Sequence, residues 1–194
     1  TTSMKQSLAR KLLGWLGWTL EGAKPTSARY VLIAAPHTSN WDFPLMLLFA
    51  AAFDMKVTWI AKHSIYWPPL GWLKRALGGK PIKRHNNTRS VDAMIEAFSQ
   101  LEKLVLVVPT EGTRARADYW KSGLYHIARK ADVPIVPSFL DFGSKRGGFG
   151  PAMVTTGEVT ADMDYFRDFY RGMEGKFPSL FGPILLREEE DPDV

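Results

Sequence analysis

The chain has 194 residues, 45% of them hydrophobic, which is enough to bury one full core, so its length does not require a second domain. It has no cysteine, which excludes disulfides, thiolate metal sites and cysteine nucleophiles and fits a reducing, cytoplasmic compartment. The sequence has neither an apolar run long enough to cross a bilayer nor a signal-peptide pattern, so we expect a protein that is soluble or lies on a membrane surface.

The formal charge of +5 is distributed unevenly along the chain. Residues 55–91 contain eight basic side chains and no acidic one, which predicts an anionic partner: nucleic acid, a phosphorylated metabolite or a membrane surface. Residues 187–194 contain five acids and one arginine, and we expect them to form a solvated, disordered tail. The sequence contains no recognised nucleic-acid-binding module, so nucleic acid is not expected as the partner.

The first 24 residues are expected to form a short amphipathic helix and a connection to the main domain. Apolar side chains recur near helical spacing over residues 4–20, at Leu8, Leu12, Trp15, Leu16 and Leu20. Basic residues lie mostly off this stripe. Such a helix is typical of an interfacial membrane anchor, and it also fits a terminal helix packed on the domain, so both interpretations stay open.

Strand-like and helical patterns then alternate through residues 25–186, which we expect to form one domain. Strands are predicted over residues 29–35, 56–61, 80–84, 104–108, 133–140 and 151–156. Helices are predicted over residues 41–54, 71–77, 88–103, 122–131 and 162–171. Continuous apolar strands separated by helices predict an α/β fold, with a mostly parallel central sheet covered by helices on both faces.

Polar residues follow the first predicted strand of this domain. In mostly parallel sheets, active-site groups gather at the carboxyl ends of the strands. His37 comes directly after that strand, and Asp42 opens the next predicted helix. A histidine with a carboxylate in reach can act as a general base, because the carboxylate fixes the tautomer of the imidazole. The same spacing also fits a loop histidine beside an aspartate that only caps the helix, so the pattern alone leaves two interpretations.

No protein nucleophile accompanies this pair. Cysteine is absent and no Gly-x-Ser-x-Gly sequence occurs, so a base at His37 would activate a hydroxyl of the substrate. The four histidines are scattered, without the spacing of a zinc site, and we expect no metal and no cofactor.

A second polar block follows the predicted strand 104–108. Glu111, Gly112, Thr113 and Arg114 combine a carboxylate, a flexible glycine, a hydroxyl and a planar guanidinium. Arginine binds phosphate in bidentate fashion and glycine lets the backbone approach it, although a surface turn with a solvated arginine has the same composition. Arg84, at the end of a basic run, is a second candidate for a phosphate contact or a generic surface residue.

Five short blocks therefore follow one another along the chain: His37-x4-Asp42 and residues 62–69, 79–84, 111–114 and 133–137. In this order they resemble the motifs of the glycerolipid acyltransferase family, which transfers a fatty acyl group from acyl-CoA or acyl carrier protein to a glycerol hydroxyl. The resemblance implies that His37 is the base and that Asp42 orients it.

The resemblance also implies a lysophospholipid-type acceptor, with 1-acylglycerol-3-phosphate as the first candidate. Residues 111–114 would shape the acceptor site, Arg84 and Lys62 would bind its phosphate, and Lys121 would belong to the same site. Another lysolipid or an amino lipid is an alternative acceptor, and an inactive lipid-binding protein at the membrane surface is an alternative function.

The basic middle of the chain gains a meaning from this resemblance. Residues 65–75 mix tryptophan, proline and cationic side chains, a composition that favours the boundary between water and anionic lipid. We expect this segment to bind an anionic membrane surface together with the N-terminal helix. Its alternative is a loop whose tryptophans pack on the core.

Overall fold

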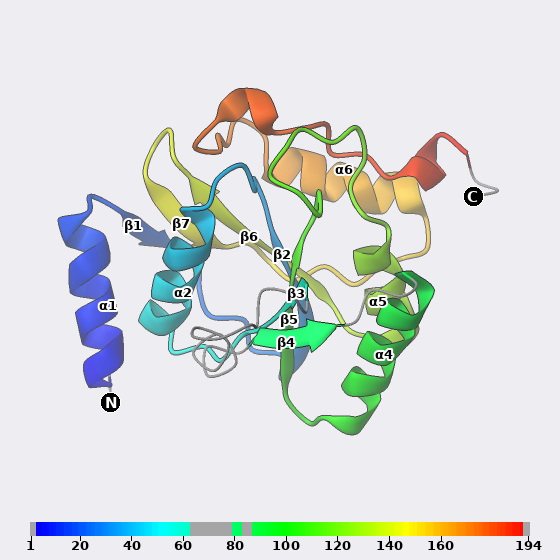
Figure 1. Ribbon diagram of the computed structural model, residues 1–194, viewed down its shortest axis with the longest axis horizontal. Coiled ribbons are helices and arrows are strands. Elements are labelled where there is room, and N and C mark those ends of the chain that lie inside the picture. Colours follow the sequence, from blue (N-terminus) through cyan, green and yellow to red (C-terminus); the bar gives the residue numbers. More distant parts are fainter. Residues whose placement is uncertain (1–2, 63–78, 83–86, 192–194) are drawn as a thin grey trace.

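Figure 1 shows the computed structural model, which describes residues 3–62, 79–82 and 87–191, with the backbone alone for 59–62, 79–82 and 87–90. Seven strands of these residues form one sheet in the order β1-β7-β6-β2-β5-β3-β4. Their bounds are β1 (Thr19–Glu21), β2 (Arg29–Ala34), β3 (Thr58–Lys62), β4 (Gly79–Ile82), β5 (Leu104–Pro109), β6 (Ile135–Asp141) and β7 (Arg146–Phe149). All neighbouring pairs are parallel except β6 and β7, which confirms the mostly parallel sheet.

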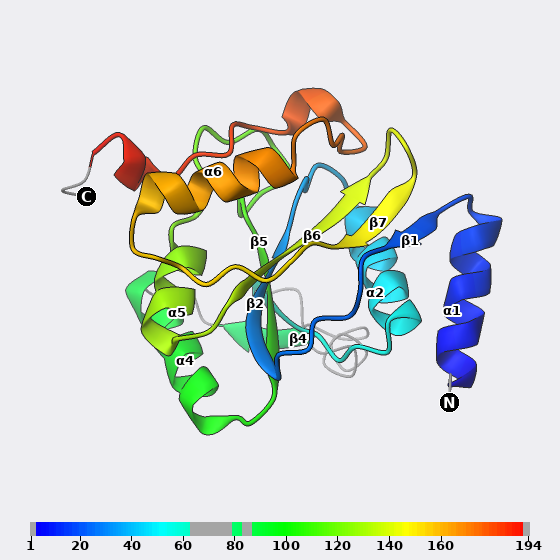
Figure 2. The same ribbon diagram turned by 180° about the vertical axis from the view of Figure 1, so that it is seen from behind.

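Helices cover both faces of the sheet, as predicted. The described helices are α1 (Met4–Trp15), α2 (Asp42–Ala52), α4 (Asn87–Gln100), α5 (Gly123–Ala131) and α6 (Val159–Phe169), with 3-10 helices η2 (Pro178–Leu180) and η3 (Arg187–Glu189). Figures 1 and 2 show α4, α5 and α6 on one side of the sheet and α1 and α2 on the other. The predicted helix over residues 71–77 lies outside the described residues.

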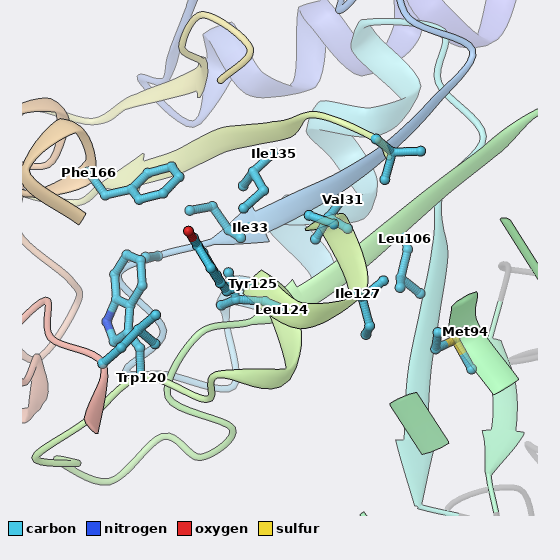
Figure 3. Close-up of a cluster of buried hydrophobic side chains, with 14 of the residues drawn as sticks. Val31, Ile33, Met94, Leu106, Trp120, Leu124, Tyr125, Ile127, Ile135 and Phe166 are labelled. Carbon is cyan, nitrogen blue, oxygen red and sulfur yellow. The ribbon is translucent and has the colours of Figure 1, made fainter. Parts of the chain in front are cut away.

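The alternating side chains of β2 supply two separate cores. Val31 and Ile33 point into a cluster with Ile135 of β6 and Phe166 of α6, which Figure 3 shows. Tyr30 and Leu32 point the other way, into a cluster formed with α1 and α2. Because successive residues of a strand face opposite sides, a strand buried on both faces reads as a continuous apolar run.

The N-terminal helix ends earlier than predicted. Gly17 adopts a φ of 79°, and the Trp18 N–H donates to Leu13 O at 2.8 Å, so the chain turns out of the helix and continues as β1. Leu20, predicted on the helical stripe, therefore lies in a strand. Along α1 itself, Ala9 and Leu13 are buried against the domain. The outward side carries exposed Met4, Leu8, Leu12 and Trp15, followed by exposed Leu16.

The strand predicted over residues 151–156 is wrong. This stretch makes one isolated bridge, between Met153 and Ile135. The strand that pairs antiparallel with β6 is β7, which precedes this stretch in the sequence. The sequence of β7, Arg-Gly-Gly-Phe, lacks the β-branched residues that mark strands. A Cβ placed on Gly148 would lie 1.8 Å from Glu21 O, so the glycine is what lets β1 pair alongside β7.

Part of the acidic end, for which a disordered tail over residues 187–194 is predicted, forms regular structure in the described residues. Arg187–Glu189 form η3, and Leu186 before it is 1% exposed. Glu189 lies 2.9 Å from the guanidinium of Arg167 on α6, so ion pairing offsets the repulsion that composition alone suggests.

Candidate active site

The loop between β2 and α2 places His37 against Asp42. The Nδ1 atom of His37 lies 3.1 Å from Oδ2 of Asp42, and the aspartate is 5% exposed. The backbone N–H groups of Thr38 and Ser39 donate to the same Oδ2 atom, each at 2.9 Å. Asp42 therefore binds the loop backbone and the histidine at once, so the two interpretations of the spacing are not exclusive.

This arrangement fixes the histidine for acid–base chemistry. The Asp42 carboxylate lies within reach of Nδ1, and a proton on that nitrogen would leave Nε2 with its lone pair. The His37 side chain is 20% exposed and lines a cavity of about 600 Å³. An oriented imidazole with a basic nitrogen at a cavity wall can accept a proton from a bound hydroxyl.

Most of the cavity wall is apolar. Helix α2 and the neighbouring strands contribute large side chains, including Leu32, Phe43, Met46, Phe49, Leu140 and Phe149. Sequence reasoning did not place these residues in a site. The available signal was helix α2 itself, with the sequence Asp-Phe-Pro-Leu-Met-Leu-Leu-Phe-Ala-Ala-Ala, because an apolar helix with no polar face must be covered on all sides or border an apolar cavity.

Part of the second block lines the same cavity. Gly112 turns the chain after β5 with a φ of 67°, and Thr113 and Arg114 follow it into the cavity wall. Arg114 is exposed and makes no hydrogen bond or ion pair with any residue that the structure describes. Its guanidinium is thus available to an anionic ligand.

Glu111 points elsewhere. It is 1% exposed and does not line the cavity, and its Oε1 accepts the Gly182 N–H at 2.7 Å. Burial raises the pKa of the Glu111 carboxyl, while the hydrogen bond from Gly182 and the charges of His37 and Arg116 act in the opposite direction. This environment is typical of a carboxyl that makes a structural hydrogen bond. A carboxyl that contacts a ligand would be expected to line the cavity.

Among the remaining predicted residues, the structure describes the side chain of Lys121. Lys121 is absent from the lining of the cavity, and the aliphatic part of its side chain packs where a Cβ on Gly112 would lie, at 3.0 Å. Lys62 ends β3, but only its backbone is described, and Arg84 lies outside the described residues, as does the segment 65–75.

Residues 18–141 match the family described as Acyltransferase. The chain is 29% identical over 136 residues to the 1-acyl-sn-glycerol-3-phosphate acyltransferase of Escherichia coli (strain K12), covering 66% of this chain and 54% of that protein. It is 27% identical over 135 residues to the Saccharomyces cerevisiae protein of the same name, covering 66% and 44%. The chain thus spans about half the length of the curated relatives it matches.

A solved structure shares the fold. The crystal structure of the 1-acyl-sn-glycerophosphate (LPA) acyltransferase from Thermotoga maritima superposes with a TM-score of 0.60 at 21% identity, covering 84% of this chain and 74% of that one. The motif resemblance is confirmed by the family match, which contains both the His37–Asp42 loop and the block at 111–114. The chain belongs to the acyltransferase family.

Proposed function

We propose that this protein is an O-acyltransferase that moves a fatty acyl group from an acyl thioester, acyl-CoA or acyl carrier protein, to the hydroxyl of a lysophospholipid. The first candidate for the acceptor is 1-acylglycerol-3-phosphate, the substrate named in the relatives from Escherichia coli and yeast. One observation carries the proposal: the His37–Asp42 pair and Arg114 line a single, largely apolar cavity.

The proposed reaction needs no acyl-enzyme. Nε2 of His37 takes the proton of the acceptor hydroxyl while the hydroxyl oxygen attacks the thioester carbonyl. The carbon–sulfur bond then breaks, and the imidazolium returns the proton to the leaving thiolate. Asp42 keeps Nδ1–H oriented and stabilises the transient positive charge on the ring.

The two parts of the cavity suit the two ends of the reactants. The apolar wall formed by Met46, Phe49 and Leu140 offers a water-poor surface for an acyl chain. Arg114 offers two parallel N–H groups for the phosphate of the acceptor. In this placement the acceptor hydroxyl would lie between Nε2 of His37, which takes its proton, and the thioester carbonyl that it attacks.

The experiment that tests this function measures release of free thiol from acyl-CoA with a panel of lysolipids and amino lipids as acceptors. We expect turnover with a phosphate-bearing lysolipid, and His37→Ala should lower kcat by about 10² to 10⁴. His126→Ala is the matched control, because His126 is an exposed histidine of α5 paired with Glu188. Near-normal turnover by His37→Ala, or no turnover with any thioester by the unmodified protein, would contradict the proposal.

We also propose that α1 binds an anionic membrane surface. Its outward side exposes Met4 at 87% and Trp15 at 84%, and the exposed cations Lys5 and Lys11 belong to the same helix. Every helix among the described residues is too short or too polar to cross a bilayer. Exposed apolar side chains with neighbouring cations favour binding parallel to the membrane surface, where the acceptor lipid resides.

A further inference from the structure

After α6 the chain passes over the loops that carry His37 and Arg114 and makes hydrogen bonds with both loops. Residues 174–182, here called the strap, begin beside β6, where the Glu174 N–H donates to Asp141 Oδ1 at 3.1 Å and Glu174 O accepts the Phe142 N–H at 2.8 Å. Figure 1 shows the strap, in orange, at the same end of the sheet as the loops that follow β2 and β5. The strap lies outside the family match and contains none of the motifs.

The first attachment is to the histidine loop. The Phe177 N–H donates to Oγ1 of Thr38 at 3.2 Å, and Thr38 is 2% exposed. The backbone of Thr38 in turn donates to Asp42, so one residue connects the strap to the His37–Asp42 pair. The approach requires glycine at position 175, because a Cβ there would lie 2.5 Å from Thr38 Oγ1.

The second attachment is to the loop that carries Arg114. The Gly182 N–H donates to Oε1 of Glu111, and Arg116 donates through Nη1 to Phe181 O at 2.8 Å. This contact is equally close, because a Cβ on Gly182 would lie 2.0 Å from Ala117 O. The other oxygen of Glu111, Oε2, is buried and has no hydrogen-bond partner among the described residues.

We infer that the strap sets the spacing between the His37 loop and the Gly112–Arg114 loop, and that Thr38 and Glu111 are its positioning residues. The inference rests on the proposed acyltransferase function. It assigns the Glu111 carboxylate to the strap instead of to the acceptor. That carboxylate is buried outside the cavity, and its hydrogen bond among the described residues is with Gly182. A base and a phosphate ligand on separate loops act on one substrate only if their separation is fixed.

Two pairs of variants test the hydrogen bonds. Thr38→Val and Glu111→Ala each remove an acceptor for a strap N–H, and we expect kcat to fall by about tenfold or more with the acceptor KM within about twofold of the unmodified value. Thr38→Ser and Glu111→Gln keep an oxygen in place, and should hold kcat within about threefold. Equal defects in Glu111→Gln and Glu111→Ala would overturn the inference, as would a raised acceptor KM with unchanged kcat.

A change on the strap itself gives an independent test. Gly182→Ala touches no proposed catalytic group but must push the strap away from Ala117 O, so kcat should fall as in Glu111→Ala. Ser179→Ala, at an exposed position between the two attachments, is the control and should leave kcat unchanged. Normal kcat in Gly182→Ala would overturn the inference.

Amide hydrogen exchange of residues 174–182 separates this inference from the proposed function, because it requires no turnover. We expect exchange of the strap to be faster by about tenfold or more in Glu111→Ala and Gly182→Ala, and unchanged in Glu111→Gln and Ser179→Ala. Unchanged exchange in Glu111→Ala would show that the carboxylate does not hold the strap, whether or not the protein turns over a thioester.

Discussion

Asp42 makes its hydrogen bonds through one oxygen only. Oδ2 accepts the two loop N–H groups and faces His37, while Oδ1 is buried and has no partner among the described residues. An asparagine can therefore keep its carbonyl oxygen at the Oδ2 position and place its NH₂ group where Oδ1 lies. Substitution to asparagine removes the charge and leaves the loop geometry nearly intact.

We predict that Asp42→Asn lowers kcat for acyl transfer by about 10²-fold or more, because an uncharged partner stabilises the imidazolium less. The free energy of unfolding should change by less than about 1 kcal/mol, because the two loop hydrogen bonds persist. Thiol-release kinetics and denaturant unfolding measure the two effects.

Asp162→Asn is the matched control for a buried aspartate. Both Asp162 oxygens accept hydrogen bonds, from groups that include the Tyr125 hydroxyl and the Thr156 N–H. This variant should lose stability and keep kcat. A normal kcat in Asp42→Asn would show that the charge of Asp42 has no part in the reaction.

The buried carboxyl of Glu111 predicts a dependence of stability on pH. Burial raises the folded-state pKa of Glu111 above the usual 4.5. Protonation of this carboxyl therefore stabilises the folded state relative to the unfolded state. That favourable contribution is fully present below the unfolded pKa and is lost as the pH rises through the folded pKa. Glu111→Gln cannot ionise, so the stability of the unmodified protein relative to this variant should fall as the pH rises from below 4.5 and then level off.

Denaturant unfolding of both proteins at a series of pH values checks this prediction. The difference between the two curves is the informative quantity, because other titrating groups contribute equally to both proteins. A difference that is constant with pH would show that the Glu111 carboxyl has the same pKa in the folded and unfolded chains.

Single residues of the site were predictable where the motif lies within one loop. The contact between His37 and Asp42 and the exposure of Arg114 to the cavity follow from positions close in sequence to strand ends. The partner of Glu111 lies 71 residues away and that of Thr38 lies 139 residues away. No local pattern marks such pairs, because a backbone N–H is available on almost every residue.

At the scale of elements, β7 depends on glycines that interrupt the usual signals of a strand. A Cβ added at Gly148 would lie 1.8 Å from the carbonyl oxygen of Glu21. The register between β1 and β7, which pairs Glu21 with Gly148, therefore requires that residue 148 has no side chain.

We predict that Gly148→Ala destabilises the protein by about 1 to 3 kcal/mol, because β1 must move to admit the methyl group. Gly14→Ala is the control: a Cβ there meets nothing within 4 Å, and alanine in a helix should stabilise it by about 0.5 to 1 kcal/mol. Denaturant midpoints measure both. Equal midpoints for Gly148→Ala and the unmodified protein would contradict the tight pairing.

The alternation of strands and helices was predictable because apolar runs of strand length and helical spacing recur with clear breaks. The failures lie where tertiary contacts override local preference. β7 forms despite its glycines because β6 and β1 supply its hydrogen bonds, and the chain over 151–156 reads as a strand but makes a single bridge.

At the scale of the whole molecule, the outward side of α1 carries the prediction for membrane binding. Replacing Leu8 and Trp15 together by aspartate should lower partitioning onto anionic phosphatidylserine vesicles by about tenfold or more, because it removes apolar contact and adds negative charge. Vesicle cosedimentation at low and high salt measures the loss.

The control is a single replacement of an exposed apolar side chain by aspartate elsewhere on the surface. Val154→Asp alters a side chain that is 67% exposed and precedes α6 in the sequence. Figure 2 shows α6 on the opposite side of the sheet from α1. This variant should leave partitioning unchanged. Equal partitioning of the Leu8 and Trp15 double variant and the unmodified protein would exclude α1 as the membrane-binding element.

The core formed by the cluster around Val31 and Ile33 extends beyond the part of the chain that the family match covers. The family match ends at residue 141, yet Met163, Phe166 and Tyr170 beyond it pack against Val31 and Ile33 within it. The segment that the family match covers, residues 18–141, is therefore shorter than the segment that contributes side chains to the core. A substitution beyond residue 141 in this chain therefore acts on the packing beneath the motifs, so residues that no motif contains can change the geometry of the site.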